Sequence, residues 1–405
     1  MNEKLQELFF LIGLEKIEKV KALLLSQDVE GLNLNERDTS GKTLFISACK
    51  LGNLDIVELL LKEKRIDVNL TDKTGRTGFL TACIYNRVQI VKLLLTHERV
   101  DVNKSDLRKN SPFPYVCRHG YWELVRILIQ DERILDLNTQ DHAGRTPFFL
   151  ICETDKPEIV ELLFADQRID FSRPTVSGTT ALMIACLNGH IDVVRLFLEN
   201  YKRINFDLNF LNKDGKTAFY IASERGEKEI VQLMLGYDDI DINKGDEKDI
   251  TPLMISCIRN KVETVRVLLT DPRLNINYRN EKQQTAFYLS CFHTRFEIAK
   301  LLLQDKRMTL DQETEQGIIA IWTALLNGSL DILQLIISRS TEINFENGLK
   351  ILAENPLLKS KFEEKKQIVQ LLSDLQINPQ NTILSCTQDL AVKGNYFILI
   401  LFFYF

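Results

Sequence analysis

The sequence lacks the short motifs that mark the commonest catalytic sites. There is no G-x-G-x-x-G, no P-loop, no H-E-x-x-H and no G-x-S-x-G among its 405 residues. Histidine is also scarce, and isolated surface positions explain the five that occur better than a metal or acid–base role: His97, His119, His142, His190 and His293. We therefore predict a protein that is not an enzyme and uses no metal, cofactor or small-molecule substrate.

The chain also lacks an excess of positive charge and a secretory signal. Its formal net charge is −5 and its pI is about 5.8, so we do not expect nucleic acid as a partner. The first residues, MNEKLQELFFLIGLEK, place acidic side chains before a short apolar run, unlike a signal peptide. We therefore expect an intracellular, cytoplasmic protein.

Long apolar runs are absent too. The longest feature of this kind, Tyr396 to Phe405, holds ten apolar residues, about half of the roughly 20 that span a bilayer. Three interpretations of this run stay open: a sticky tail, a contact with a membrane interface, or a gene-model error.

No C-x-x-C pair occurs, yet seven of the eight cysteines follow a register. The steps between them are 34, 34, 35, 34, 71 and 34 residues, and Ser223 stands at the skipped place. Helical units stack about 8–10 Å apart, too far for disulfides between equivalent positions. The register predicts a repeat array with small buried thiols: Cys49, Cys83, Cys117, Cys152, Cys186, Cys257 and Cys291.

A second register of hydroxyl residues lies six positions before the first. Hydroxyl side chains favour helix N-caps, and Pro112, Pro147 and Pro252 follow where a missing N–H costs nothing. We expect a short helix to begin at each position, and the series ends on Ile319: Thr43, Thr77, Ser111, Thr146, Thr180, Thr217, Thr251 and Thr285.

Each unit continues with a glycine-marked break, a second aliphatic helix and a turn. Ile56 to Leu61 is apolar over a stripe wider than one face, which predicts a helix packed on both sides. Asp72 and Gly75 fit the first and fourth places of a type I turn. Each unit therefore consists of a turn-rich finger, a helix, a turn, a helix and a loop.

This pattern resembles the ankyrin repeat, with its β-turn, two helices and T-P-L-H-x-A motif. The stretches Gly144 to Phe149 and Thr180 to His190 carry the resemblance most clearly. It implies an all-α repeat solenoid with short β-hairpin-like fingers. In the family the motif histidine ties helix to finger, and here apolar packing must substitute, because the position holds Ile46, Leu80, Pro114, Phe149, Met183, Tyr220, Met254, Tyr288 and Trp322.

The predicted organisation has four parts. We expect a degenerate N-terminal capping unit in residues 1–35, nine repeats in 36–345, capping helices in 346–376 and a poorly ordered tail in 377–405. Lys109 and Pro114 predict a local irregularity in the third repeat. Three additional residues within 199–205 predict a longer loop.

Arginine recurs just past the second helix of most units. A basic stripe for phosphate or an acidic partner is one interpretation. Helix C-termini also favour cations, and acids such as Glu63 and Asp131 lie nearby, so we favour a structural role. The positions are Arg65, Arg99, Arg133, Arg168, Arg203, Arg273 and Arg307.

The resemblance places partner contacts at the fingertips and just after the cysteine position, on the concave face. Residues there differ between units, and aromatic and arginine side chains dominate interfaces. We predict a scaffold or adaptor that binds a partner protein. The alternative is a regulatory or targeting module of a larger assembly with a C-terminal membrane contact. The predicted contact residues are Tyr85, Arg118, His119, Tyr121, Arg225, Arg259, Phe292, His293 and Trp322.

Overall fold

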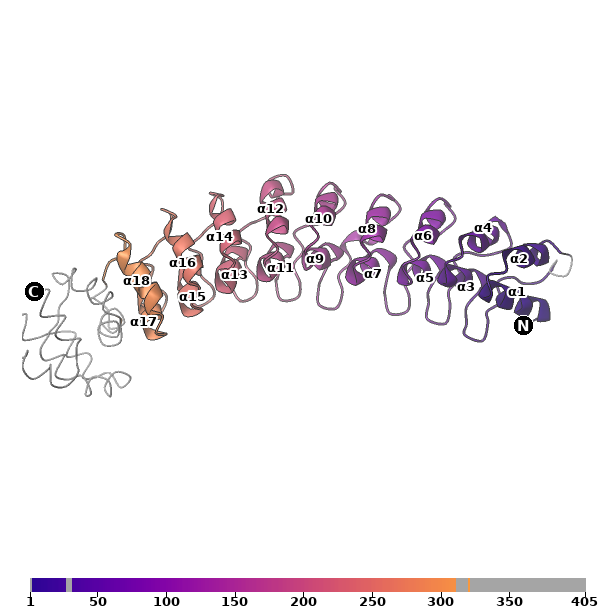
Figure 1. Cartoon of the computed structure of the whole chain (residues 1–405), viewed down its shortest axis with the longest axis horizontal. Helices are drawn as coiled ribbons and strands as arrows, with labels where there is room; N and C mark the ends of the chain where they lie inside the picture. The colour runs from indigo at the N-terminus through magenta and orange to yellow at the C-terminus, as the bar shows by residue number, and fades with distance from the viewer. Residues whose placement is uncertain (1, 27–30, 311–319, 321–405) are drawn as a thin grey trace, which may run out of the picture. The chain divides into compact units, whose positions relative to one another are not determined.

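A computed structural model describes residues 2–26, 31–310 and 320, and these residues are helical except for connecting loops and turns (Figure 1). The chain divides into block 1, residues 1–207, and block 2, residues 208–405. The described helices of block 1 are α1 (Glu3–Gly13), α2 (Ile17–Leu24), α3 (Leu44–Leu51), α4 (Leu54–Lys62), α5 (Gly78–Ile84), α6 (Val88–Leu95), α7 (Pro112–His119), α8 (Trp122–Ile129), the 3-10 helix η2 (Asp136–Asn138), α9 (Pro147–Cys152), α10 (Pro157–Phe164), α11 (Ala181–Asn188) and α12 (Ile191–Asn200). Those of block 2 are α13 (Ala218–Arg225), α14 (Lys228–Leu235), α15 (Pro252–Ile258), α16 (Val262–Leu269), α17 (Ala286–Phe292) and α18 (Phe296–Gln304).

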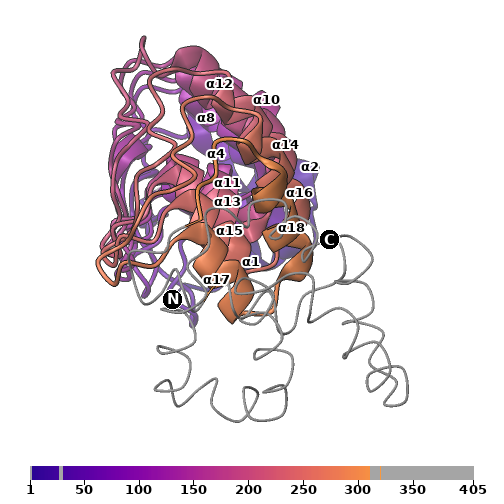
Figure 2. The same ribbon diagram turned by 90° about the vertical axis from the view of Figure 1, so that its left-hand side faces the viewer.

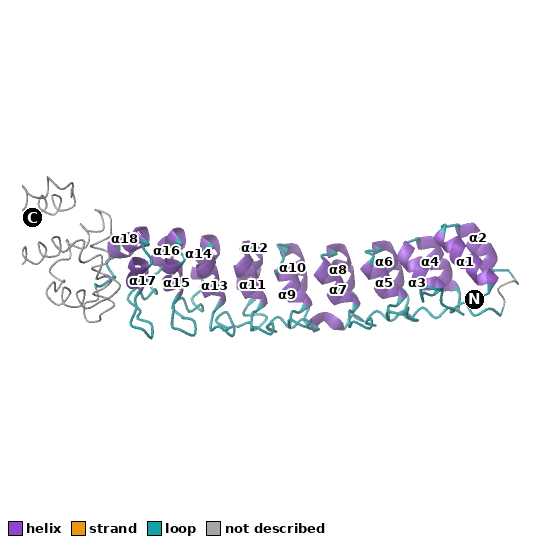
Figure 3. Ribbon diagram, turned by 90° about the horizontal axis from the view of Figure 1, so that it is seen from below, coloured by secondary structure: helices purple, strands orange, loops and turns teal. Residues whose placement is uncertain are grey.

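Each block stacks its helix–turn–helix pairs in two rows. The odd-numbered helices contact one another in chain order and form the inner row, while the even-numbered helices form the outer row. The fingers that precede the inner helices extend away from the outer row (Figures 2 and 3). The predicted all-α stacked architecture is confirmed.

The hydroxyl register caps the inner helices as predicted, with one exception. Threonine oxygens accept a hydrogen bond from the backbone N–H three residues on, as Thr77 does from Leu80 at 3.1 Å. Ser111 makes no such bond. The residue three positions on is Pro114, which has no N–H to donate. The irregularity of the third repeat therefore includes a lost cap, whereas helix α7 itself stays intact.

The fingers are tight turns. The Gly75 N–H donates to the Asp72 carbonyl at 3.0 Å, and the Asp72 N–H donates to the Arg76 carbonyl at 2.9 Å. Lys109 takes the place of the glycine with φ of 63°, the left-handed conformation that glycine adopts most easily. No described residue forms a β-strand, so the fingers are hairpin-like only at their turns.

The predicted boundaries can be compared with the described helices only in part. Helices α1 and α2 fall in the predicted capping segment 1–35, and α3 to α18 make up eight of the nine predicted repeats. The ninth repeat is described only up to residue 310 and at Ala320. The segments 346–376 and 377–405 lie outside the described residues. The additional residues near 200 lengthen α12 and the turn after it.

The cysteine register marks the packed side of the inner helices. All seven cysteines of the register are buried and none of them forms a disulfide, as predicted. The motif-histidine position is also mostly buried and apolar, as at Ile46, Leu80 and Met254. Tyr220 is an exception, because its hydroxyl donates to Asp246 of the next finger at 3.1 Å. Apolar packing thus replaces the histidine in most of the described units, and at Tyr220 a hydrogen bond to the next finger replaces it.

Ser223 provides a test of this packing. It is fully buried at the skipped cysteine position, and its hydroxyl has no hydrogen-bond partner among the described residues. An unsatisfied buried polar group costs about 1–3 kcal/mol. We expect Ser223→Cys to raise the free energy of unfolding by about 1 kcal/mol, measured by urea denaturation. Ser290→Cys is the control, because the Ser290 hydroxyl donates to the Phe287 carbonyl at 2.7 Å and should not improve on replacement.

Asparagine side chains join neighbouring repeats. The Asn103 side-chain amide donates to the Arg133 carbonyl at 2.7 Å, and its oxygen accepts from the Leu135 N–H at 2.9 Å. One side chain thus satisfies two backbone groups of the following repeat. The same pair of bonds recurs at Asn35, Asn69, Asn138, Asn209, Asn243 and Asn277.

The arginine register is structural, as we favoured. Arg133 donates to the Leu95 carbonyl at 2.6 Å and the His97 carbonyl at 3.3 Å, at the end of the outer helix of the preceding repeat. It also pairs with Asp131 at 2.6 Å. Arg273 and Arg307 repeat this arrangement in block 2. These donors are used within the fold, which argues against the phosphate-binding stripe.

Candidate functional site

Block 1 brings three of the predicted contact residues together. Tyr85 follows helix α5, while His119 and Tyr121 lie at the end of α7 and just beyond it. The His119 ring stacks on Tyr115, with ring centroids 3.9 Å apart, and lies 5.9 Å from the Tyr121 ring. Helix α5 packs against α7, so Tyr85 lies beside this group. Burial raises the pKa of Tyr115, and Tyr121 and Tyr85 add to the rise. We call Tyr85, Tyr115, His119 and Tyr121 the aromatic patch.

Tyr115 belongs to the aromatic patch but was not among the predicted contact residues. Its repeat position lies inside the inner helix, before the cysteine, where most other units hold buried residues. Tyr115 is only half-buried, because its ring turns toward His119. Two fingertip residues were also not singled out: Leu107 and Val176 are 77% and 60% exposed. Such exposed apolar tips are candidates for partner contact.

Fingers and inner-helix ends of block 1 share one surface. Arg118, at the end of α7, pairs with Asp141 of the next finger at 3.3 Å. Arg145 pairs with Asp141 at 3.0 Å and approaches Glu153 after α9 at 3.8 Å. Arg118 is therefore a partly neutralised cation. We call the surface formed by the fingers and the C-terminal ends of the inner helices the finger side. In block 1 it includes the aromatic patch and Lys50, which lies 5.2 Å from the centroid of the Tyr85 ring.

The carboxylates that open these fingers are bonded within the turn. Asp106 is 5% exposed and accepts from the N–H groups of Arg108 and Asn110, each at 2.9 Å. Burial alone would raise the pKa of Asp106, but these hydrogen bonds outweigh it and the pKa falls below its usual range. Burial likewise acts to raise the pKa of Asp38 and Asp141, and hydrogen bonds again outweigh it, so both pKa values are lowered. These acids hold the turns rather than meet a partner.

Block 2 contains four further predicted contact residues. Phe292 is 48% exposed and stacks on Tyr288, with centroids 5.7 Å apart. Its ring also meets His293 edge-on at 5.3 Å. Burial, with Arg295 nearby, lowers the pKa of His293, so this ring is neutral at pH 7.

The two arginines of block 2 differ. Arg259 pairs with Glu224 at 3.1 Å, and Glu224 also pairs with Lys216 at 2.9 Å. Arg225 is exposed at the end of α13. The ninth predicted contact residue, Trp322, lies outside the described residues. The predicted list therefore forms a joined cluster in block 1 and a set of pairs in block 2.

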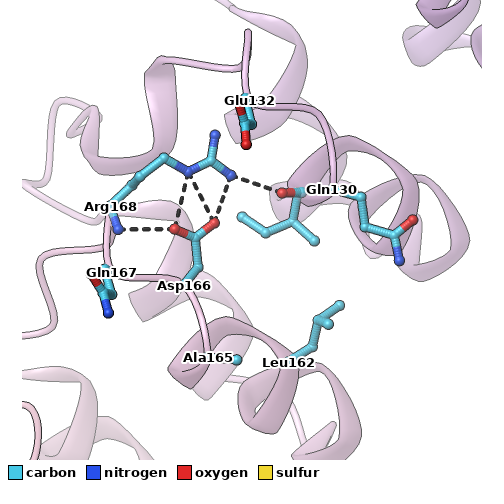
Figure 4. A pocket seen from close by; sticks show the side chains of 8 residues that line it. Gln130, Glu132, Leu162, Ala165, Asp166, Gln167 and Arg168 are labelled. Atoms are coloured by element: carbon cyan, nitrogen blue, oxygen red, sulfur yellow. Dashed lines mark hydrogen bonds and ion pairs between the residues drawn. The ribbon is translucent and has the colours of Figure 1, made fainter.

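A depression of about 600 Å³ lies between the ends of the outer helices α8 and α10 (Figure 4). Arg168 and Asp166 occupy one wall and bind each other at 2.6 Å, and Arg168 also donates to the Ile129 carbonyl at 2.8 Å. Hydrogen bonding from Arg168 lowers the pKa of Asp166. The charged groups thus neutralise each other and do not form an acid–base pair suited to catalysis.

The described residues contain no group of three or more histidine, cysteine, aspartate or glutamate side chains that could hold a metal ion. Within the same ranges, no helix has the length and apolar character needed to cross a membrane. The apolar run Tyr396 to Phe405 lies outside them.

Acid should destabilise both blocks. Hydrogen bonds from Arg133, Arg168 and Arg273 lower the pKa of their aspartate partners, Asp131, Asp166 and Asp271. The unfolded chain, with aspartate pKa values near about 3.9, therefore binds more protons in acid than the folded chain does. The contribution of these aspartates to the free energy of unfolding is fully present above about pH 5 and is lost as pH falls through and below about 4.

We expect the urea midpoint to be unchanged between pH 7 and 6 as far as these pairs are concerned, and to fall between pH 5 and 3. Asp131→Asn should show a smaller fall over the same interval, because one titrating pair is gone. A midpoint that rises on acidification would contradict the assignment.

A comparison with known protein families identifies the same repeats. A family model described as ankyrin repeats (three copies) matches residues 8–106, 113–206, 169–246, 204–280 and 241–314. The matches extend over most of block 1 and over block 2 as far as residue 314, and they include eight of the nine predicted contact residues. Only Trp322 lies beyond the last match.

Proposed function

Because this chain belongs to the ankyrin-repeat family, whose domains are generally protein–protein interaction modules, we propose that it is a non-catalytic scaffold or adaptor. A partner protein binds the finger side of the inner helices. The repeats present a large preformed surface there, so little backbone ordering opposes binding.

The observation that carries the proposal is the aromatic patch. Tyr85 is 42% exposed although it lies beside the packed inner row, and the inner helix that it follows, α5, packs against α7, which carries Tyr115 and His119. Tyrosine and arginine are enriched among the residues that dominate binding energy. In block 2, Phe292, His293, Arg225 and Arg259 are the candidate contacts.

A pull-down from native lysate tests the proposal with three full-length variants. One combines Tyr85→Ala, Arg118→Ala and Tyr121→Ala, and the second combines Arg225→Ala, Arg259→Ala and Phe292→Ala. The control changes exposed cations on outer helices: Lys62→Ala, Lys92→Ala and Arg126→Ala.

At least one finger-side variant should lose a partner by about tenfold or more, while the control retains it. Circular dichroism verifies that all three variants fold. Recovery of the same proteins by wild type and all variants would show that the finger side is not the binding surface.

A further inference from the structure

We propose that the finger side of block 1 recognises an acidic segment of its partner protein. This inference rests on the proposed function and adds the chemistry of the partner. It comes from the charges that surround the aromatic patch, which differ from those of block 2.

Several cations on this surface lack a compensating acid. No described carboxylate lies within ion-pair distance of the side chains of Lys50, Lys73, Arg87, Arg108 or Lys109. Lys73 donates to the Thr39 carbonyl at 3.1 Å, and Arg87 to the Lys50 carbonyl at 3.0 Å. Hydrogen bonds to carbonyls position these side chains but leave their charge unneutralised. All except Lys50 are exposed.

The fingertips of block 1 add no negative charge. We define each fingertip as the three residues that follow the opening position of the turn. In block 1 these are 39–41, 73–75, 107–109, 142–144 and 176–178, and none of them is acidic. The acids that open the turns, such as Asp106, are held by backbone N–H groups. A ligand that approaches this surface therefore meets cations, aromatic rings and the exposed Leu107 and Val176.

Block 2 differs at the same positions. Its described fingertips carry Asp214, Glu247, Asp249 and Glu281, interspersed with lysines. The cations of the block 1 fingertips, Lys73, Arg108 and Lys109, therefore have no acid beside them, whereas the three lysines of the block 2 fingertips stand among four acids. Because opposite potentials favour binding and like charges suppress wrong partners, this surface selects an acidic ligand.

A protein segment fits better than a nucleic acid. The exposed leucine and valine tips suit apolar side chains placed between carboxylates. The occupant is therefore an acidic peptide segment that also carries apolar residues.

Fluorescence anisotropy with the full-length chain tests this chemistry. The probe is a fluorescein-labelled peptide of repeated Glu-Leu-Glu-Gly, compared with the Gln-Leu-Gln-Gly peptide and a single-stranded oligouridylate of similar length. The charge-reversal variant combines Lys50→Glu, Arg108→Glu and Lys109→Glu. Its matched control makes the same change in net charge on outer helices, with Lys62→Glu, Lys92→Glu and Arg126→Glu.

The glutamate peptide should bind at least about tenfold tighter than the glutamine peptide at about 50 mM salt, and more weakly as salt rises. The charge-reversal variant should lose about tenfold in affinity, and its control should not. Tighter binding of the oligouridylate would assign the surface to nucleic acid.

Three other results would overturn the inference: equal affinity for both peptides, no binding of the glutamate peptide, or an unaffected charge-reversal variant. Self-association of the free chain that the reversal abolishes would instead assign the surface to a second copy. If the pull-down depends on the finger side but the peptides show no charge preference, only this inference fails. If the pull-down shows no dependence, the proposed function fails.

Discussion

Replacing Phe197 with alanine is expected to lower the free energy of unfolding by about 4 kcal/mol. Phe197 is fully buried in α12, and its ring lies 5.6 Å from Phe148, 5.2 Å from Phe164 and 5.2 Å from Phe206, centroid to centroid. Phe171 completes the group through contacts with Phe148 and Phe164. This phenylalanine group joins successive repeats of block 1. The cavity left by Phe197→Ala would therefore weaken the packing of both rows of helices.

Urea denaturation followed by circular dichroism measures this effect. Phe197→Leu should cost clearly less, because most of the volume is kept. Phe10→Ala is the surface control, since Phe10 is 64% exposed on α1. A loss below about 1 kcal/mol for Phe197→Ala would mean that the surrounding repeats collapse into the space.

Arg133→Ala should lower the free energy of unfolding by about 2–3 kcal/mol. The guanidinium group satisfies the carbonyls of Leu95 and His97 at the C-terminus of the preceding outer helix and pairs with Asp131. Its removal takes away the side-chain donor of both carbonyls and the charged partner of Asp131, although the Val100 N–H still donates to the His97 carbonyl and the backbone N–H of residue 133 still donates to the Asp131 carboxylate. The hydrogen bonds that Arg133 donates to Asp131 raise the pKa of Arg133, consistent with a preference for the charged form in the fold.

Arg133→Lys tests whether the stabilising effect of Arg133 comes from the geometry of its hydrogen bonds or from its positive charge. Lysine keeps the positive charge but cannot donate to two carbonyls and a carboxylate from one planar group, so most of the loss should remain. Arg126→Ala, on the exposed side of α8, should change stability by less than about 0.5 kcal/mol. Full recovery of stability by Arg133→Lys would show that charge alone matters.

The repeat architecture could be predicted because it rests on local signals that recur. Thr77 precedes Cys83 by the same six residues that separate Thr43 from Cys49, and both threonines cap their helices. The missing cap at Ser111 could also have been predicted, since Pro114 removes the donor. The asparagines that join neighbouring repeats also recur regularly in the sequence. Their role could not be predicted, because each bonds to a residue about 30 positions further along the chain, and the residues around it look like an ordinary turn.

The candidate site could be predicted only in part. Position in the repeat pointed to Tyr85, His119 and Tyr121, yet not to Tyr115, whose exposure depends on how its ring stacks. Sequence likewise does not show which charges are already paired. Arg118 and Arg259 meet acids of neighbouring repeats, whereas Arg108 and Lys109 do not.

The buried cysteines have a practical consequence. Burial raises the pKa of the thiols of Cys49, Cys83, Cys257 and Cys291, so the reactive thiolate is rare while their repeats stay closed. Each becomes reactive only when its own repeat opens. A Cys386→Ser chain pulsed with an alkylating reagent and digested for mass spectrometry would therefore report opening rates repeat by repeat. The chain carries native, position-resolved probes of partial unfolding, with no engineered label.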